Sequence, residues 1–532
     1  GIHLAHLWRR LYRLCRHYGS HPQYLITTAP LGNLRQATHS LTGQPCTVIH
    51  GEAWQRQSQT RMILEVSGNA VMITHKIATQ LSEAGMAPRI LAFDTDVRPQ
   101  AESDIPRRNP LSDHDVRSVI FLGVPTSLTR LHEYLAWLAS RPTPSASILI
   151  LHGQTPLERY LLRYPAVYQT AWLQDLPLHL SHPLIARQHL LCAASELALE
   201  AGERYAGLDG LSDLINQLAA DNTIVRHPTA RRWITTQHQP HRRVRLRSYE
   251  PAFAVVHQHD RRLITTLEPD RAFRELFEGA IFHHASDWFH VQRYLADQRR
   301  ILVRPTHDTH HRTRGLVKTW VTDRHIEASQ STATYRVTYG TLTCTATMHA
   351  FEHRDARTLT RTSLHILPNH QRQFHTQGVW IDFPDAAAVP HQDLQTAVHT
   401  LIHAVLAGIP LMVLGEGMPL RGVICDQNDP GAAGLTAVFV DPHTGGSGLS
   451  RCFYRAQERV LRVALQLLLQ CECDRGCGDC IAEQSCDACE TAVGVDRQAG
   501  INLLQRMLGE VAPTLEAIRP QVESAQIANH HG

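Results

Sequence analysis

The sequence predicts a multidomain protein of mixed class, in which α/β units are followed by α+β units. A chain of 532 residues is too long for a single hydrophobic core. Its first 150 residues or so alternate short apolar runs with helical patterns, which is typical of α/β sheets. Residues 250 to 385 change to short alternating strands, and a dense group of cysteines follows near the C-terminus. We therefore expect several domains with different architectures.

The N-terminal third supplies the α/β part. Residues 1 to 18 have the pattern of an amphipathic helix, and an apolar run over 24 to 33 predicts a buried strand before a helix at 34 to 41. Two further buried strands are expected at 116 to 125 and 146 to 152, with a helix from 127 to 140 between them. The expected buried stripe of the first helix consists of Leu4, Leu7, Trp8, Leu11 and Leu14, opposite Arg9, Arg10, Arg13 and Arg16.

The middle of the chain predicts a small helical module with a basic wing. A helical pattern spans about 185 to 220, and the following segment has the pattern of a β-hairpin. Arginine binds phosphate in a bidentate manner and tryptophan stacks on bases, so this segment is a candidate nucleic-acid patch. The alternative is a solvated wing whose arginines form salt bridges. The candidate residues are Arg226, Arg231, Arg232, Trp233, Arg242, Arg243, Arg245 and Arg247.

The second half of the chain predicts a β-rich, barrel-like domain followed by a helical one. Alternating strands fill 250 to 385, with turns expected at Gly279, Gly315 and Gly340. No combination of nucleophile, base and orienting group is recognisable there. The final domain is expected to contain helices at 394 to 407 and 449 to 469. The second helix has one apolar stripe, which consists of Phe453, Ala456, Val460, Val463, Ala464 and Leu467. Between the two helices, the glycine loop after the strand at 437 to 441 is interpreted as a structural turn.

Six of the 12 cysteines fall between Cys471 and Cys489, at the spacing C-x-C-x3-C-x2-C-x5-C-x2-C. A knuckle such as Cys477-Gly-Asp-Cys480 directs two sulfurs at one point, and a second pair completes a closed Zn2+ site. A disulfide cluster is the alternative. The other cysteines are scattered through apolar or mixed segments, as in proteins of a reducing compartment, and this favours zinc.

Several of these segments together resemble one helicase family. They are the N-terminal helix, residues 155 to 165 and 189 to 197, Asp441 with Gly445-Gly446, and the cysteine cluster. The chain resembles superfamily 2 DEAD/DEAH-box DNA helicases that end in an MrfA-like zinc-binding domain, the mitomycin-repair helicase type. The resemblance implies a remnant of the first RecA-like lobe at 1–50, a reduced second RecA-like lobe at 51–154, a linker and winged-helix-like module at 155–248, a β-rich domain at 249–388 and the zinc-binding domain at 389–532.

The resemblance also implies a set of zinc ligands, and it shows that the ATPase motifs of the family are missing or altered in this chain. The family's ligand pattern falls on Cys473, Cys477, Cys480 and Cys486, with replacement of one ligand by Cys471 or Cys489 left open. The chain contains no Gly-x4-Gly-Lys-Ser/Thr P-loop. The family's Ser-Ala-Thr motif is Thr28-Ala29-Pro30 here. Trp137 and Ser140 occupy the two arginine positions of the family's Gln-x-x-Gly-Arg-x-Gly-Arg motif, and Arg141 lies one residue after the second of them. We assign no catalytic residue, and we expect ATP only if its motifs are supplied upstream or in trans.

Three hypotheses follow for the function. The first is a helicase-related DNA-binding protein with a structural zinc site, acting as a non-catalytic part or subunit of a DNA repair or anti-phage defence helicase. It would bind single-stranded DNA or a duplex junction and possibly pair with an ATPase subunit. The second is the C-terminal fragment of an active ATP-dependent helicase, and the third is a structural zinc protein without nucleic acid. The sequence contains no run of about 18 apolar residues, which a membrane-spanning helix would need. We therefore expect a cytoplasmic protein.

Overall fold

The structure is a computed structural model, and it describes most of the chain. The described residues are 1–28, 31–49, 59–92, 116–124, 128–140, 144–153, 156–169, 174–200, 205, 210–227, 232–246, 250–285, 287–356, 358, 360–383, 391–413, 420–426, 434–477, 480–481, 486–490 and 494–509.

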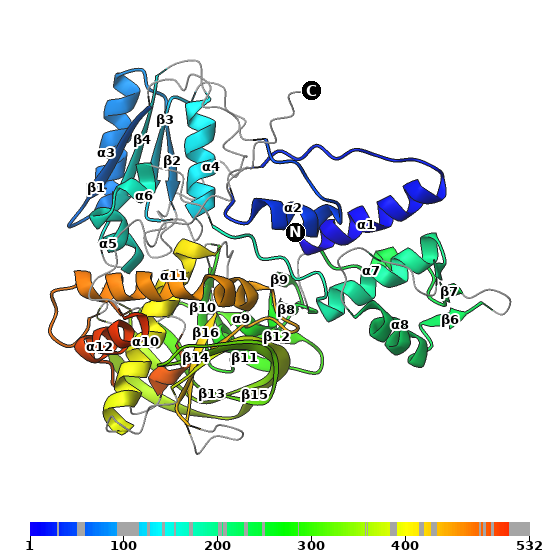
Figure 1. Ribbon diagram of the computed structural model, residues 1–532. Helices are drawn as coiled ribbons and strands as arrows, with labels where there is room; N and C mark the ends of the chain where they lie inside the picture. The colour runs from blue at the N-terminus through cyan, green and yellow to red at the C-terminus, as the bar shows by residue number, and fades with distance from the viewer. Residues whose placement is uncertain are drawn as a thin grey trace.

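A four-stranded parallel sheet forms the α/β part, with strand order β1-β4-β3-β2. Alternate residues of β3 and β4 face opposite sides of the sheet. Ile120 and Ile148 pack toward α3, whereas Phe121 and Leu149 share a core with α4, so one helix covers each face (Figure 1). The predicted strands and the helix between them are confirmed. The elements are β1 (Gln59–Glu65), α3 (Ala70–Glu83), β2 (Pro88–Ala92), β3 (Ser118–Leu122), α4 (Leu128–Ala139), β4 (Ser145–Leu151), α5 (Pro156–Arg163) and α6 (Ala166–Gln169).

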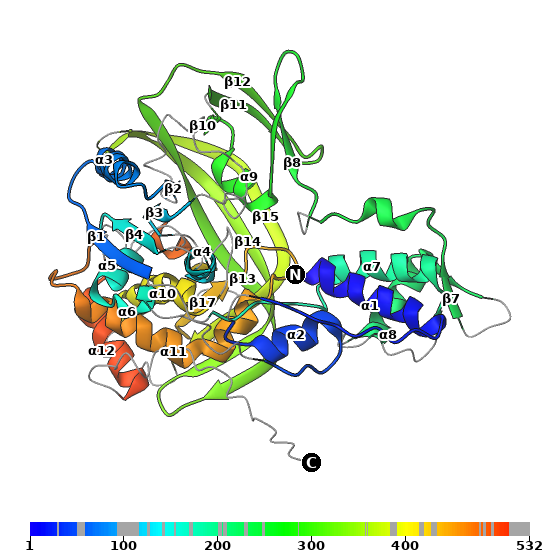
Figure 2. The ribbon, with the colours of Figure 1, turned by 90° about the horizontal axis from the view of Figure 1, so that it is seen from above.

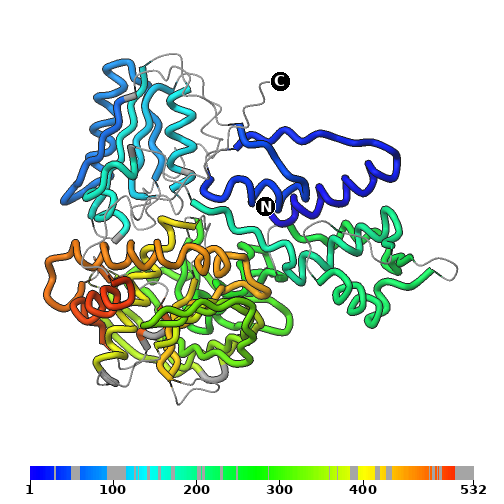
Figure 3. Tube along the Cα trace, viewed as in Figure 1, coloured from blue at the N-terminus to red at the C-terminus, as the bar shows by residue number. Residues whose placement is uncertain are grey.

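The N-terminal helices lie apart from this sheet, beside a second helical module (Figures 2 and 3). In that module a three-stranded sheet of order β5-β7-β6 closes against α7 and α8 around a small core of its own. This combination of helices and a short antiparallel hairpin is the predicted winged-helix arrangement. The elements are α1 (Ile2–His17), α2 (Leu34–Thr42), α7 (Pro183–Glu196), β5 (Leu199–Glu200), α8 (Leu211–Ala220), β6 (Ile224–Arg226), β7 (Arg232–Thr235) and the 3-10 helix η2 (Pro240–Arg243).

Helix α1 buries the face that we expected to be exposed. Three leucines of its stripe, Leu4, Leu7 and Leu11, are about half exposed, with Leu7 at 50%, while Arg9 is only 3% exposed. Arg9 donates hydrogen bonds to the carbonyls of Leu41 and Ser40 at the C-terminal end of α2, where the helix leaves carbonyl groups unsatisfied. The prediction of a buried leucine stripe was therefore wrong, because arginine side chains satisfy neighbouring backbone groups here.

The expected strand after this helix does not form in its described part. Residues 24 to 28 have no strand partner there, and Leu25 is 90% exposed. The following helix, by contrast, lies where it was predicted. Of the altered Ser-Ala-Thr motif, Ala29 and Pro30 lie outside the described residues.

The β-rich region consists of two sheets. One has the order β10-β11-β12-β8-β9, and the other begins with the long antiparallel ladder β13-β14-β15. The predicted turns at Gly315 and Gly340 are wrong, because both glycines lie inside long strands; only Gly279 lies in a loop, with φ +93°. The elements are β8 (Phe253–His257), β9 (Leu263–Leu267), α9 (Pro269–Glu275), β10 (Ile281–His284), β11 (Asp287–Leu295), β12 (Arg300–Pro305), β13 (His311–Ser331), β14 (Arg336–Asp355) and β15 (Arg361–Asp382).

The second sheet continues into the C-terminal region. β15 pairs with β17, and β17 with β16, so a single five-stranded sheet crosses the boundary that we placed at residue 388. Helices α10, α11 and α12 pack together, and α10 also contacts β16 and β17. The elements are α10 (His391–Met412), β16 (Arg421–Cys425), β17 (Thr436–Val440), α11 (Leu449–Gln470), the 3-10 helix η4 (Asp487–Glu490) and α12 (Arg497–Leu508).

Helix α10 is the central core helix of this region. Among the described helices, its segment Asp393–Met412 is the one long and apolar enough to cross a membrane, but 78% of the window tested is buried inside the protein. Leu401, Ile402 and Val405 are fully buried in the core shared with α11. Contacts within the protein therefore account for the apolar character of this helix.

Gly340 gives a test of the long ladder. A Cβ atom at this position would lie 1.9 Å from the carbonyl oxygen of His325, where the register between β13 and β14 shifts. We expect Gly340→Ala to lower the free energy of unfolding by about 1–3 kcal/mol, because the strand backbone must move to relieve the clash. Chemical denaturation measures the change. Gly434→Ala, which adds a methyl group to open space, is the control and should leave stability nearly unchanged.

Candidate zinc centre and nucleic-acid interface

The cysteine cluster begins where α11 ends. Cys471 is the C-cap residue of this helix, and the predicted apolar stripe of α11, which includes Phe453, Val460 and Leu467, is buried as expected. Packing of this stripe fixes the direction in which the chain leaves the helix. It thereby places Cys471 at the edge of the main core, at 6% exposure.

Four sulfurs of this loop converge on one point. Cys471, Cys473, Cys477 and Cys480 have their Sγ atoms within 4.8 Å of one another. The Sγ–Sγ distances are 3.5 Å between Cys471 and Cys477, 3.6 Å between Cys473 and Cys480, and 3.9 Å between Cys477 and Cys480. Zn–S bonds of about 2.3 Å in a tetrahedron give edges of about 3.8 Å. The four thiols therefore fit a closed Zn2+ site.

Backbone groups of the loop support this geometry. The backbone N–H of Cys477 donates to Cys480 Sγ at 3.4 Å, and the N–H groups of Cys480 and Ile481 donate to the carbonyl of Cys477. Arg497, at the start of α12, donates from Nε to the carbonyl of Leu468 and from its backbone N–H to the carbonyl of Arg475. The loop is thus held between the end of α11 and the start of α12.

The cluster differs from the predicted ligand set in one member. Three of the four predicted ligands lie together in it, and Cys471 occupies the place expected for Cys486. Cys486 lies instead beside Cys489 and two histidines of α10, His399 and His403, as a second group of metal-ligating side chains. Sequence reasoning left a replacement by Cys471 open but missed both histidines. The separation of about 85 residues between them and the cysteines hides the relationship.

The glycine loop before α11 is organised by Asp441. This fully buried carboxylate accepts hydrogen bonds from the backbone N–H and hydroxyl of Ser447, at 2.7 and 2.6 Å, and from the ring and backbone of His443. Burial acts to raise the pKa of Asp441, but the bonds from His443 and Ser447 hold it below its ordinary value. The residues at 445, 446 and 448 are glycines with φ between +79° and +96°, as the tight turn requires. The loop forms the structural turn that we predicted.

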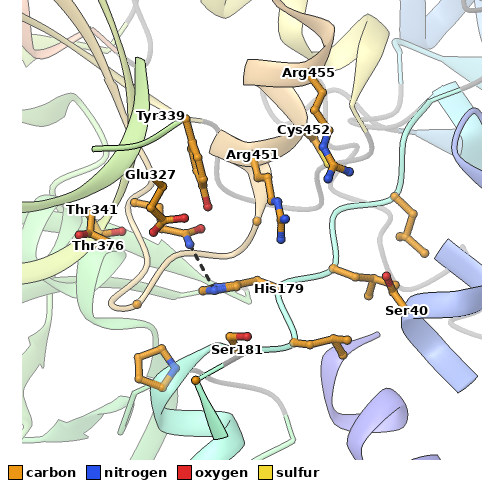
Figure 4. A pocket seen from close by; sticks show the side chains of 18 of the residues that line it. Ser40, His179, Ser181, Glu327, Tyr339, Thr341, Thr376, Arg451, Cys452 and Arg455 are labelled. Carbon is orange, nitrogen blue, oxygen red and sulfur yellow. Dashed lines mark hydrogen bonds between the residues drawn. The ribbon is translucent and has the colours of Figure 1, made fainter. Parts of the chain in front are cut away.

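This turn lines a cavity of about 880 Å3 at the junction of α2, the linker before α7, the long sheet and α11. Figure 4 shows Arg451 and Arg455 reaching toward it from α11, with His179 of the linker opposite. His179 lies 3.2 Å from Gln377 through Nε2 and 3.2 Å from the carbonyl of Gly446 through Nδ1. Burial lowers the pKa of His179, so the ring favours the neutral form. Two arginines, Arg451 and Arg455, and one carboxylate, Glu327, line this cavity, so its lining carries a net positive charge. Sequence reasoning missed this feature.

The wing part of the arginine patch is only partly available. Arg226 is exposed at the end of β6, while Arg232 forms an ion pair with Glu200 at 2.8 Å. Trp233 is half-buried and packs against the module's core, so its ring is not presented as an open stacking surface. Arg231 and Arg247 lie outside the described residues.

The other part of the patch gathers beside α7. Arg242, Arg243 and Arg245 are all exposed. Arg243 donates to Gln237 at 3.2 Å, and the backbone N–H of Arg245 donates to Gln188 of α7 at 3.3 Å. Arg243 and Arg245 line a shallow hollow of about 260 Å3 together with Arg187, a residue that the sequence pattern did not single out. Exposed guanidinium groups on one surface are the side chains that contact phosphates.

Two family models match parts of this chain. Residues 401–481 match the MrfA Zn-binding domain, and residues 178–249 match the winged helix domain of the ATP-dependent helicase HRQ1. The first match contains the four clustered cysteines. The second contains α7, α8, the small sheet and the arginines of η2. Both agree with the two modules described above.

Three curated proteins similar to this chain over most of its length are helicases. The chain is 22% identical to the uncharacterized ATP-dependent helicase YprA of Bacillus subtilis, over 91% of this chain and 72% of that protein. It is 23% identical to the ATP-dependent helicase hrq1 of Schizosaccharomyces pombe and 24% identical to HRQ1 of Saccharomyces cerevisiae. The chain spans 40% and 36% of the lengths of these two yeast proteins.

Solved structures share the fold. The crystal structure of the DUF1998 helicase MrfA matches with a TM-score of 0.64 at 20% identity, over 95% of this chain and 75% of that one. The crystal structure of MrfA bound to DNA matches with a TM-score of 0.58 at 19% identity, over 95% and 74%. The fold of this chain therefore resembles that of MrfA.

Proposed function

We propose that this chain, which is related to the superfamily 2 helicases that carry an MrfA-type zinc-binding domain, is a DNA-binding, zinc-braced part of such a helicase. In this proposal the winged-helix module contacts the phosphate backbone and the zinc cluster stabilises the adjoining domain. DNA repair or anti-phage defence is the proposed setting. The scattered free cysteines fit a reducing compartment such as the cytoplasm.

The observation that carries the DNA-binding proposal is the exposed cluster of Arg242, Arg243 and Arg245 beside α7, within the region that matches a helicase winged-helix domain. Phosphate contacts from arginine supply sequence-independent affinity and position the protein on the nucleic acid. A solved relative, MrfA, has been crystallised bound to DNA. Single-stranded DNA and a duplex junction are the proposed ligands.

The zinc part of the proposal rests on the donor chemistry of the four-cysteine cluster. Four thiolates leave no open coordination position, so the ion would have a structural role. Cys471, Cys473, Cys477 and Cys480 would hold it, linking the end of α11 to the start of α12. In this proposal the zinc site stabilises the folded C-terminal region and takes no part in a reaction.

A separate ATPase lobe is the second component that we propose. The leucine stripe of α1, formed by Leu4, Leu7 and Leu11, is about half exposed, and apolar residues at helical spacing usually pack against a partner. A nucleotide-binding lobe, encoded upstream in the same gene or by another subunit, fits this surface. An in-frame P-loop in the genomic sequence ahead of residue 1 would favour a helicase fragment and overturn the subunit version.

The DNA-binding proposal predicts a salt-dependent loss on removal of the arginines. The triple variant Arg242→Ala, Arg243→Ala, Arg245→Ala is expected to bind single-stranded DNA at least about tenfold more weakly. The slope of log K against log salt should fall by about 2, because each lost phosphate contact on a single strand contributes about 0.7. Fluorescence anisotropy with a labelled oligonucleotide, repeated on a forked duplex over a salt series, measures both.

The matched control removes the same charge elsewhere. Arg293, Arg300 and Arg304 are exposed on β11 and β12, and their triple alanine variant should keep the affinity and the slope. Equal losses in both triple variants would mean that net charge alone drives binding. Absence of salt-dependent DNA binding by the unmodified chain would favour the structural zinc protein without a nucleic-acid role.

A further inference from the structure

A second group of metal-ligating side chains lies where helix α10 meets the segment around η4. It consists of His399, His403, Cys486 and Cys489, whose ligand atoms all lie within 4.8 Å of one another. His399 and His403 are 2% and 1% exposed, and Cys486 is 8% exposed. No residue is shared with the four-cysteine cluster. Cys489 is partly buried, and the burial of the other three groups around one point demands a compensating interaction.

Both the histidine pair and the cysteine pair have the spacing of metal ligands. His399 and His403 are separated by four positions on α10 and therefore project from the same face of the helix. Cys486 and Cys489 form a Cys-x2-Cys pair, the knuckle spacing of zinc sites. Two pairs from different elements thus meet, as in a Cys2His2 site. Of these residues, only His403 falls inside the segment that matches the MrfA zinc-binding domain.

The distances between ligand atoms fit a tetrahedron. The two Nε2 atoms of His399 and His403 lie 3.2 Å apart. Cys489 Sγ lies 3.2 Å from His403 Nε2 and 3.6 Å from His399 Nε2. With Zn–N bonds of about 2.0 Å and Zn–S bonds of about 2.3 Å, tetrahedral edges are about 3.3 Å between two nitrogens and about 3.5 Å between nitrogen and sulfur. The three measured edges match this size.

The orientation of His399 agrees with a ligand role. Its Nδ1 lies 3.1 Å from the carbonyl oxygen of Gly494. Donation from Nδ1 to this carbonyl selects the tautomer in which Nε2 carries the lone pair, and Nε2 is the atom that faces the cluster. Backbone carbonyls commonly orient metal-bound histidines in this way.

We propose that His399, His403, Cys486 and Cys489 bind a second structural Zn2+ ion. Two thiolates and two neutral imidazoles complete a closed set of four ligands and leave no position for substrate. The donor set suits zinc better than magnesium or calcium, which prefer oxygen ligands. This site is separate from DNA binding and stands whether or not the arginine patch contacts DNA.

The second ion would couple two parts of the molecule. Asp487, next to Cys486, accepts two hydrogen bonds from Arg274 of α9, at 2.9 and 2.7 Å, and one from Thr319 of β13 at 2.5 Å. A metal that fastens Cys486 and Cys489 to α10 also fixes Asp487 in place. The ion therefore links the core helix of the C-terminal region to the β-rich region through η4.

Metal counting on the full chain tests the proposal. The unmodified protein is expected to hold two zinc ions per chain, and Cys489→Ser and His403→Gln are each expected to hold one. Cys477→Ser should also lose one ion, from the other cluster. Cys452→Ser removes a buried thiol outside both clusters and should keep both ions. One ion in the unmodified protein, unchanged by Cys489→Ser, would overturn the proposal.

A second measurement needs no variant to fold. Thiol alkylation followed by peptide mass spectrometry on the zinc-loaded unmodified chain should show Cys486 and Cys489 protected, and both should become reactive after chelation. Prompt alkylation of both cysteines in the zinc-loaded chain would contradict the proposal. So would a Cys486–Cys489 disulfide in protein purified without added oxidant or reductant.

Discussion

Replacing Cys477 by serine is expected to remove zinc from the four-cysteine cluster and to unfold the loop that carries its four cysteines. Structural zinc sites hold folding free energy, of about 10–16 kcal/mol in zinc-finger peptides at neutral pH. The Sγ atom of Cys477 lies within 4.8 Å of the other three sulfurs of the cluster, so its removal would leave the proposed ion with three protein ligands. We expect the free energy of unfolding of this region to fall by about 5 kcal/mol or more, a large share of the stability of a typical domain.

Zinc content and limited proteolysis check this result. Cleavage should appear within residues 471–481 in Cys477→Ser and, after chelation, in the unmodified protein. The matched control is Cys452→Ser on α11, a buried thiol outside the cluster, which should keep its zinc and resist cleavage. Full zinc content with unchanged proteolysis in Cys477→Ser would show that this thiol is not a ligand.

Acidification is expected to weaken the docking of α1 on α7. His6 and His189 stack at this interface with ring centroids 5.1 Å apart. Burial lowers the pKa of His6 to about 4, and burial together with His6 and Arg10 lowers the pKa of His189 to about 3. Because both folded pKa values lie below the ordinary 6.5, the stabilisation is complete above pH 6.5 and is lost as the pH falls toward 4 and 3. By pH 5.5 the loss is about 1.4 kcal/mol for each histidine.

Amide hydrogen exchange of α1 at pH 7.5 and pH 5.5 measures this effect, after correction for the intrinsic exchange rate. Protection of α1 should fall by about two orders of magnitude relative to the corrected reference, since 1.4 kcal/mol is a factor of ten in an equilibrium constant. His189→Gln on α7 should reduce the pH dependence, whereas His17→Gln, at an exposed position of α1, should preserve it. A pH dependence unchanged by His189→Gln would assign the effect to other groups.

Local pattern predicted the interior of the protein well and its interfaces poorly. The stripe on α11 was identified because apolar side chains at helical spacing must be buried somewhere. The same reasoning failed for α1, since periodicity does not say what covers a face. Arg9 is buried because the carbonyls of Leu41 and Ser40 lie against it, and that contact joins residues about 30 positions apart. Gly340 was assigned to a turn because a glycine that relieves a close approach inside a strand has the same signature in sequence.

For the candidate sites too, local features could be predicted from the sequence and contacts between distant segments could not. Spacing alone indicated a metal cluster near Cys477 and Cys480, because a knuckle is a local structure. It did not indicate which cysteines lie in the same cluster, because Cys486 meets two histidines of α10 that are far away in the sequence. For the arginines, composition located the basic segment. The fold then separated the exposed Arg243 from Trp233, which packs into the module's core.

The sheet that runs from β13 to β16 has a mechanical consequence. β15 is hydrogen-bonded to β17 over five residue pairs, from Gly378–Val440 to Asp382–Thr436, so the long β13-β14-β15 ladder and the zinc-binding region form one block. A hinge between them would require the pairing of β15 with β17 to break. Movement of this block relative to the rest of the chain is therefore expected where it meets the parallel sheet or the winged-helix module.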